Sequence, residues 1–303
     1  MLESTPYSKE SVESGTPLVS VGIPTFNRPE GLRRTLEYIT GQTYKNIEII
    51  VSDNASTHPQ VQSILNEFSG RDSRIRYFVQ KTNIGMMANL QFVFEQSTGD
   101  FFMWASDDDR WHESFIANLV LALQESPDAI LAFCDFRAIN YDGSPAYGYP
   151  KHNIKHLRAF SNPNTTIRCV RYFFQDGVKG KASLIYGLFR RDMIQETNLV
   201  LLSETSGDYA LDVLFIFRIL QKDRAIIIDN LLYEAVVNNE KLYDKKYNKK
   251  SPRVKISKLF RFCKHSSGML LFCILALIPV QLIYDNLPFE KFFKRLKRKE
   301  WNI

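Results

Sequence analysis

The chain has 303 residues, of which 45% are hydrophobic and 24% are charged. This length and composition allow one large domain, with or without an appendage, and exclude wholesale disorder. Residues 241–303 contain 16 Lys and Arg against 4 Asp and Glu, a net +12 within a total of +6, which leaves −6 for residues 1–240. This asymmetry indicates that the C-terminal tail meets a polyanion, either nucleic acid or anionic lipid.

The four cysteines show no CxxC spacing and have no His nearby at ligand spacing. We therefore expect reduced, structural thiols and a cytoplasmic protein. Residues 1–17 are polar and lack an apolar stretch, which predicts a flexible leader and not a secretory signal.

Strand and helix patterns alternate through residues 18–116. The predicted strands are 18–24, 46–53, 74–80 and 100–106, and the predicted helices between them are 28–42, 58–70 and 83–97. The strands are short, apolar and rich in β-branched residues, which is typical of buried parallel strands. A β-α alternation with short connections predicts an α/β fold in which helices cover both faces of a mostly parallel sheet.

The second half, residues 117–238, is less regular. The segments are a strand within 129–145 that enters a turn at Asp142-Gly143, a helix over 164–175, a strand turning into a short helix over 183–195, a helix over 206–221, and one or two strands over 224–237. We expect these elements to complete a domain that spans residues 18–238, followed by a tail at 239–303.

Polar residues follow three of the predicted strands, as PTFNR (24–28), SDNAS (52–56) and SDDD (106–109). Because the carboxyl ends of parallel strands meet at one edge of a sheet, we expect these loops to form one ligand site. Three consecutive carboxylates repel each other, so they need solvent, basic partners or a metal ion. A solvated acidic turn is the alternative interpretation of SDDD.

Three pieces in this region resemble the nucleotide-sugar-binding half of family-2 glycosyltransferases. They are VSVGIPTFNRPEGLRRTLEYITGQTYKNIEIIVSDNAS, TNIGMMANLQFVF and TGDFFMWASDDDRWHESFI, in the family's order and spacing over residues 18–116. The resemblance implies a GT-A fold, a Rossmann-like sandwich. Residues 18–116 would be its nucleotide-sugar half and residues 117–238 its acceptor half.

The resemblance also implies a divalent metal at the DxD pattern. Departure of a nucleoside diphosphate builds negative charge, which Mn²⁺ or Mg²⁺ neutralises, and hard oxygen ligands suit these ions. By resemblance, Asp109 binds the metal directly and Asp107 contacts the ribose or a metal-bound water. Asp108 shares the site.

Further contacts to the nucleotide sugar follow from the same resemblance. Asp53 would accept the N–H of the base, typically uracil, which favours a UDP-sugar; an Asx turn is the alternative. Arg28 would meet a phosphate, since the dipole of the following helix disfavours an unpaired cation there. The complete predicted set is Pro24, Thr25, Phe26, Asn27, Arg28, Asp53, Asn83, Gly85, Asn89, Asp107 and Asp108.

An inverting enzyme of this family also needs a base for the acceptor hydroxyl. The resemblance favours Asp208, although Gly207 replaces the Glu that the family often has there. Asp212 lies four residues further, on the same helical face, and is the alternative. A carboxylate can take the proton directly as the oxygen attacks. A helix-start charge is the other interpretation of Asp208.

The tail combines an apolar run with basic flanks. Residues 268–284 contain 17 residues without a formal charge, and a bilayer span needs about 17–25. Residues 289–301 are basic and amphipathic, which suits an anionic membrane surface. Because basic residues lie on both sides, we expect an in-plane or re-entrant helical anchor on the cytoplasmic leaflet. A helical extension packed on the body or on a second subunit is the alternative.

The sequence thus predicts a metal-dependent, inverting glycosyltransferase that moves a sugar from a nucleoside-diphosphate sugar to a lipid-linked or cell-surface polysaccharide acceptor. A non-catalytic partner with the same fold is one alternative. A sugar-phosphate nucleotidyltransferase is disfavoured because GIPTFNRPEG is no Gly-rich phosphate loop. Nucleic acid is not an expected partner, since the apolar run in the tail fits lipid better. The sequence does not specify the sugar, the base, the acceptor or the oligomeric state.

Overall fold

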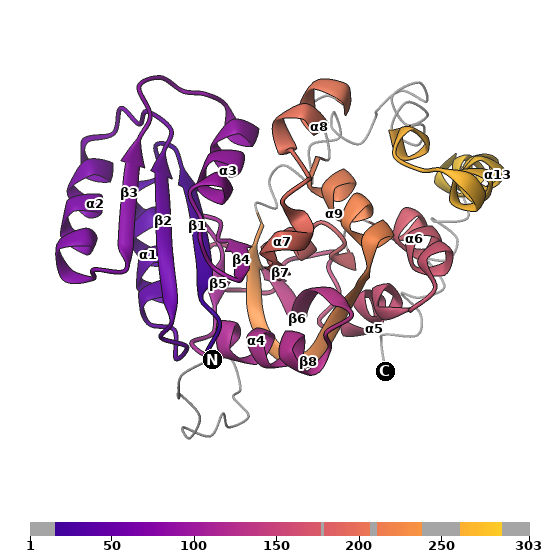
Figure 1. Cartoon of the computed structure of the whole chain (residues 1–303), viewed down its shortest axis with the longest axis horizontal. Coiled ribbons are helices and arrows are strands. Elements are labelled where there is room, and N and C mark those ends of the chain that lie inside the picture. Colours follow the sequence, from indigo (N-terminus) through magenta and orange to yellow (C-terminus); the bar gives the residue numbers. More distant parts are fainter. Residues whose placement is uncertain (1–15, 177–178, 207–210, 238–260, 287–303) are drawn as a thin grey trace.

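A single sheet organises the molecule in the computed structural model, which describes residues 16–176, 179–206, 211–237 and 261–286 (Figure 1). In the described residues, eight strands follow the order β3-β2-β1-β4-β7-β6-β8-β5. They are β1 (Val19–Thr25), β2 (Ile47–Asp53), β3 (Ile75–Val79), β4 (Phe101–Trp104), β5 (Arg110–Trp111), β6 (Ala129–Ile139), β7 (Leu188–Arg190) and β8 (Arg224–Val236).

Helices cover the sheet. They are α1 (Pro29–Thr40), α2 (Pro59–Arg71), α3 (Met86–Glu95), α4 (Phe115–Glu125), α5 (Ile154–Leu157), α6 (Thr165–Phe174), α7 (Arg191–Ile194), α8 (Leu199–Ser206), α9 (Leu211–Lys222) and α13 (Gly268–Asn286), with 3₁₀ turns η1 (Arg158–Ser161) and η3 (Ser183–Tyr186). From β1 the sheet extends in one direction through β2 and β3, and β4 lies on the opposite side of β1. Right-handed crossovers therefore put α1 and α2 on one face and α3 on the other.

The first half confirms the predicted elements. Each of the four predicted strands and three predicted helices is present, with ends shifted by a few residues. Val19, Val21 and Ile23 of β1 are fully buried, and β1 pairs in parallel with both β2 and β4. Apolar runs without alternation predicted this correctly because a central parallel strand is covered on both faces.

The second half contains pairings that the sequence pattern did not predict. The strand expected within 183–195 is β7, which is antiparallel to both β4 and β6. The final segment is one strand, β8, parallel to β6 with register shifts around Asp135. The turn at Asp142-Gly143 is present, with φ of 85° at Gly143. The short strand β5 and helix α8 were not predicted.

The two halves share one core. Trp104, at the end of β4, is buried and packs its ring against Phe189 of β7 at 5.9 Å and Phe215 of α9 at 5.4 Å between centroids. Its indole N–H donates to the Leu90 carbonyl of α3 at 3.0 Å. The end of β4 is therefore fixed by residues from both halves.

Helix α13 lies at the opposite end of the molecule from α2 (Figure 1) and contains the apolar run predicted at 268–284. It contacts α6, and Leu270 and Ile274 are buried. Met269 and Phe272 are exposed. Among the described helices, none has both the length and the apolar character that a bilayer crossing requires. The basic segment 289–301 and leader residues 1–15 lie outside the described residues.

Candidate active site

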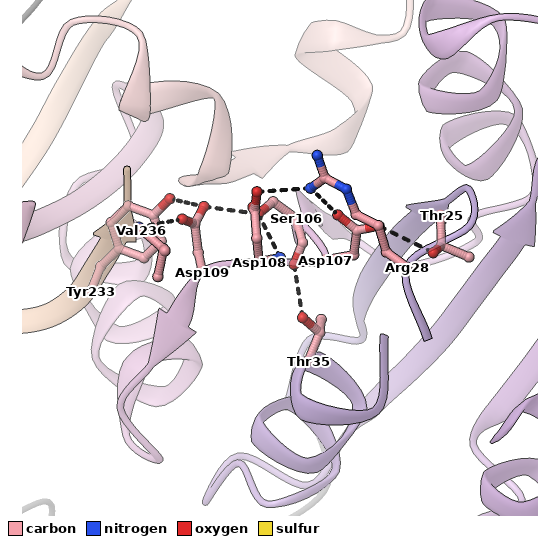
Figure 2. A network of polar contacts seen from close by, with 9 residues as sticks. All are labelled: Thr25, Arg28, Thr35, Ser106, Asp107, Asp108, Asp109, Tyr233 and Val236. Carbon is pink, nitrogen blue, oxygen red and sulfur yellow. Dashed lines mark hydrogen bonds and ion pairs between the residues drawn. The ribbon is translucent and has the colours of Figure 1, made fainter. Parts of the chain in front are cut away.

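The loop after β4 carries the three aspartates and lies against α1 (Figure 2). The Thr35 hydroxyl of α1 donates a hydrogen bond to the Ser106 carbonyl at 2.9 Å. A Cβ atom at Gly31 would lie 1.9 Å from the Asp107 carbonyl oxygen. Only glycine permits this approach, so α1 fixes the backbone of the loop.

Arg28, directly before α1, bridges two of the aspartates (Figure 2). Its Nη1 atom lies 3.0 Å from Asp107 Oδ1 and 2.8 Å from Asp108 Oδ2. The Thr25 hydroxyl donates to Asp107 Oδ2 at 3.1 Å. Burial raises the pKa of Asp107, and the charge of Arg28 opposes this rise. The guanidinium thus supplies the basic partner that adjacent carboxylates require.

Asp109 points away from Arg28, toward β8 (Figure 2). Its carboxylate accepts hydrogen bonds from the Tyr233 hydroxyl, from the Val236 N–H at 2.8 Å and from the Ser106 hydroxyl at 2.9 Å. Burial and then the charge of Asp108 raise the pKa of Asp109 to about 7, although the bond from Tyr233 opposes this. Asp109 therefore connects the loop to β8.

The carboxylates that best fit a divalent cation are Asp107 and Asp108. Within the described ranges no three His, Cys, Asp or Glu side chains gather as a metal-binding group. Oxygens of Asp107 and Asp108 nevertheless converge on one positive atom, Arg28 Nη1. Mg²⁺-type ions commonly take one or two carboxylates and complete their shell with water and phosphate. Direct ligation by Asp109, which the resemblance implies, stays a prediction, since among the residues that the structure describes Oδ1 of Asp109 accepts only the Val236 N–H and keeps a second lone pair.

A pocket of about 500 Å³ opens beside this loop. The predicted residues that line it are Pro24, Thr25, Phe26, Arg28, Asn83, Asn89, Asp107 and Asp108. Four others, Asn27, Asp53, Gly85 and Asp109, are not among its lining residues. The loops after β1, β2 and β4 thus meet at one site, as the strand pattern predicted.

Sequence reasoning missed Met86 and Asn54 as lining residues of the pocket. Met86 is 65% exposed and lines the pocket together with the predicted Phe26, which is 42% exposed. Asn54 joins them and donates its side-chain N–H to Asn83 Oδ1 at 3.0 Å. The position of Asn54, directly after Asp53 at the end of β2, could have indicated that Asn54 lines the pocket, but the sequence analysis assigned a role to Asp53 alone. Met86 gave no such signal, because its helical spacing is also that of packing residues.

Asp53 and Asn27 shape the neighbouring loops. Asp53 Oδ1 accepts the Ser56 N–H at 3.0 Å, which is the Asx turn considered as the alternative. Asn27 has a positive φ of 54°, and its Oδ1 accepts the Thr57 N–H at 2.8 Å. The Asp53 bond shapes the loop after β2, and the Asn27 bond holds the loop after β1 against it.

Gly85 and Asn89 are one helical turn apart, as predicted, since the Asn89 N–H donates to the Gly85 carbonyl at 3.1 Å. Gly85 has φ of 86°, a conformation that favours glycine, and it begins α3. The Asn89 amide exchanges hydrogen bonds with Ser52 of β2 at 2.6 and 3.0 Å. These residues anchor the start of α3 beside the pocket.

Asp212 and Tyr186, both from the second half of the chain, are further titratable residues of this region. Asp208, the predicted base, lies outside the described residues. Asp212, the alternative, lies in the first turn of α9, and burial raises its pKa. Burial also raises the pKa of Tyr186 well above its usual value, and the charges of Asp109 and Asp212 contribute. Tyr186 lines the pocket, and the charge of Asp212 acts on it, so Asp212 is within electrostatic range of a pocket residue.

The sequence profile of glycosyl transferase family 2 matches residues 20–179, more than half of the chain. The chain belongs to this family. It is 31% identical over 119 residues to the GalNAc(5)-diNAcBac-PP-undecaprenol beta-1,3-glucosyltransferase of Campylobacter jejuni, which covers 39% of this chain and 38% of that protein. It is 32% identical over 107 residues to the glycosyltransferase GlyA of Streptococcus pneumoniae, covering 35% and 15% of the two chains.

Solved structures agree with this family-2 assignment at the level of the fold. S. aureus TarS 1–349 in complex with UDP-GlcNAc superposes with a TM-score of 0.61 at 16% identity, covering 88% of this chain and 72% of that chain. The mannosyltransferase PcManGT from Pyrobaculum calidifontis, in complex with GDP-Man and Mn²⁺, gives 0.55 at 16% identity over 89% and 72%. The predicted GT-A-like α/β fold is therefore confirmed. The chain spans less than half the length of the curated relatives described above.

Proposed function

We propose that this family-2 protein is a metal-dependent, inverting glycosyltransferase that uses a nucleoside-diphosphate sugar. The observation that carries the proposal is the pairing of Asp107 and Asp108 with Arg28 at a pocket with exposed Phe26 and Met86 in its wall. A nucleoside diphosphate needs an apolar surface for its base and fixed charge for its phosphates, and the pocket offers both.

The base of the nucleotide would lie over the loops after β1 and β2. Phe26 offers it an apolar face, and Asn54 and Asn83 offer amide groups. In the described part of the chain, Asp53 uses Oδ1 for its Asx turn, which leaves Oδ2 for a base N–H. A uracil base supplies such a donor, so a UDP-sugar is the first donor to test. TarS, a structural neighbour, has been solved with UDP-GlcNAc.

Asp107 and Asp108 would hold Mn²⁺ or Mg²⁺, and the bound ion would neutralise charge on the departing diphosphate. Arg28 carries a second positive charge that can turn toward a phosphate, since its side chain is about half exposed. Asp109 keeps the loop in position through Tyr233 and Val236.

Asp212 would act as the base. Burial raises its pKa, which makes its ionised form a better proton acceptor than an exposed aspartate. Removal of the acceptor hydroxyl proton by Asp212 would let the oxygen attack the anomeric carbon opposite the departing diphosphate. A single displacement of this kind inverts the configuration at that carbon.

The acceptor would be a lipid-linked or cell-surface polysaccharide, reached at the cytoplasmic face of a membrane. The C. jejuni relative is named for an undecaprenol-linked acceptor. Helix α13 has an exposed apolar side that includes Met269 and Phe272. Segments 238–260 and 287–303, which flank residues 261–286, contain 14 Lys and Arg against 4 Asp and Glu. An apolar helix side between basic segments fits an anionic lipid surface.

Calorimetric titration with UDP and GDP, with and without Mn²⁺, tests the donor site. We expect manganese-dependent binding of one nucleotide, weakened at least tenfold in Asp107→Asn/Asp108→Asn, because charged contacts contribute about 1.5–3 kcal/mol each. Glu125→Gln is the matched control, since Glu125 is exposed on α4 and does not line the pocket.

Thermal unfolding of each variant shows whether it is folded. A nucleotide affinity that changes neither with manganese nor with the double substitution would contradict the metal site. A folded wild-type protein that binds no nucleoside diphosphate would favour a non-catalytic partner of the same fold.

A further inference from the structure

Tyr186 reaches the aspartate loop because of the way β7 pairs. β7 is antiparallel to β4, with Phe102 opposite Phe189 and Phe101 opposite Arg190. The chain therefore enters β7 at the same edge where β4 leaves the sheet for the aspartates. Tyr186 is the last residue of η3, two residues before β7 begins.

Gly187 sets the position of Tyr186. A Cβ atom at Gly187 would lie 2.4 Å from Leu131 Cδ1 and 2.6 Å from the Ala132 carbonyl oxygen, both in β6. The absence of a side chain lets the backbone lie against β6. On its other side, the Tyr186 ring packs on Tyr233 with centroids 6.0 Å apart. Tyr186 is thus held between the sheet and the tyrosine that binds Asp109.

The Tyr186 hydroxyl is available to a ligand. The neighbouring hydroxyl of Tyr233 donates to Asp109, whereas the hydroxyl of Tyr186 makes no hydrogen bond within the part of the chain that the structure describes. A tyrosine hydroxyl is protonated at neutral pH and can donate a hydrogen bond. Tyr186 lines the same pocket as Asp107 and Asp108.

The lining residues of the pocket follow the same sequence across the sheet as the strands that carry them. Adjacent strands run β2-β1-β4-β7. Phe26 and Asn54 follow β1 and β2, Asp107 and Asp108 follow β4, and Tyr186 precedes β7. A nucleotide sugar has the same linear order of base, diphosphate and sugar. With the base at β1 and β2 and the diphosphate at β4, the sugar falls at β7.

We propose that Tyr186 binds the transferred sugar of the donor, through a hydrogen bond from its hydroxyl, and does not contact the nucleotide. This assignment rests on the proposed function. It makes Tyr186 a residue that distinguishes among sugars.

Binding measurements on Tyr186→Phe test the assignment without turnover. The probes are UDP and GDP, and UDP-GlcNAc, UDP-glucose and GDP-mannose, each titrated with Mn²⁺ into the full-length protein. We expect Tyr186→Phe to weaken the best-binding sugar nucleotide by about three- to tenfold, the effect of one hydrogen bond, and to leave its nucleoside diphosphate unchanged. Tyr141→Phe is the matched control, because Tyr141 is exposed and does not line the pocket.

The outcomes separate the two proposals. If nucleoside diphosphates bind and Tyr186→Phe changes the affinity for sugar nucleotide and diphosphate equally, or changes neither, the assignment of Tyr186 is wrong while the donor site stands. If the folded wild-type protein binds none of the five probes, the donor site itself is wrong, and the assignment of Tyr186 fails with it.

Discussion

At the scale of single residues, the three consecutive aspartates have the same chemistry and different partners. Asp107 is held by Thr25 and Arg28, and Asp108 shares the same guanidinium. Asp109 is buried on Tyr233. Burial therefore raises the pKa of Asp109 to about 7, while Arg28 offsets part of the burial effect on Asp107. Two of the carboxylates thus share a guanidinium at the pocket, and the third is buried against β8.

Asp212→Asn tests the proposed base. Because burial raises the pKa of Asp212 above its usual value, protonation inactivates the base at a higher pH than it would an exposed aspartate. We expect turnover to fall as the pH falls through that raised pKa. Asp212→Asn should lower turnover about 10²- to 10⁴-fold and remove this acid limb. The measurement is release of nucleoside diphosphate from the bound sugar nucleotide across pH.

Nucleotide binding should stay unchanged in Asp212→Asn, and Glu125→Gln should behave as the wild type. Turnover retained within a few-fold in Asp212→Asn would remove Asp212 from the mechanism and return attention to Asp208.

Residue types predicted the presence of a charged site but not the direction of each side chain. The acidic run SDDD (106–109) predicted a cation site, and Arg28 at a helix start indicated an anionic partner. Side chains in a turn do not follow the regular periodicity of a helix or strand. The sequence therefore could not show that Asp109 points toward β8 while Asp108 points toward Arg28. Tyr186 carried no motif at all, because its role depends on β7 pairing with β4 across about 85 residues of chain.

At the scale of elements, α1 is the support of the aspartate loop. Its Thr35 hydroxyl binds the loop backbone, and its Gly31 lies against the Asp107 carbonyl. The same helix begins at Pro29, directly after Arg28. One helix thus sets the position of the bridging arginine and of the carboxylates that it bridges.

Gly31→Ala should displace the loop, because the added Cβ would meet a backbone oxygen at 1.9 Å. We expect the free energy of unfolding to fall by about 1–3 kcal/mol, the usual cost of overpacking, and manganese-dependent nucleotide affinity to fall at least tenfold. Denaturant titration and calorimetry measure the two effects.

Gly70→Ala in α2 is the control, since a Cβ there meets nothing within 4 Å. It should leave binding unchanged and stabilise the protein slightly through helix propensity. Wild-type nucleotide affinity in Gly31→Ala would show that the loop does not depend on this contact.

The elements of the first half were predictable because their signals are local. Apolar runs such as β1 and helical spacing such as that of α1 need no knowledge of partners. β5 has two residues and is defined only by its pairing with β8, far away in sequence. A strand was expected within residues 183–195, where β7 lies, but its antiparallel pairing with β4 and β6 was not. Pairing with a distant strand leaves no periodic pattern, so the second half of the chain was predicted only coarsely.

At the scale of the whole molecule, the exposed apolar side chains of α13 make one end of the protein different from the end that carries α2 (Figure 1). The helix contacts α6, and its Leu270 and Ile274 are buried, while Met269 and Phe272 are exposed. Strands β1–β3, which precede the loops of the proposed nucleotide site, lie at the other end (Figure 1). A protein resting on lipid through α13 would therefore keep those strands away from the surface.

Phe272→Glu tests the proposed membrane contact. Phe272 is 69% exposed, so the substitution should leave the fold intact. Because burying a large apolar side chain contributes about 1.5–3 kcal/mol, we expect co-sedimentation with phosphatidylglycerol-containing vesicles to weaken about 10- to 100-fold.

Leu121→Glu on α4 is the control, an equally drastic change at an exposed leucine on another surface. Unchanged vesicle binding in Phe272→Glu would contradict a lipid contact through α13. If Phe272→Glu instead converted a dimer to a monomer, the same face would be a subunit contact.

The position of β4 has a consequence for motion. This strand pairs with β1 from the first half of the chain on one side and with β7 from the second half on the other. Rotation of one half against the other would break that ladder and the packing around Trp104, which opposes hinge closure between the halves. Under the proposed function, substrate entry and product departure would then depend on loops and single side chains. Arg28 is the best placed of these, because it can exchange the aspartates for a phosphate without moving the sheet.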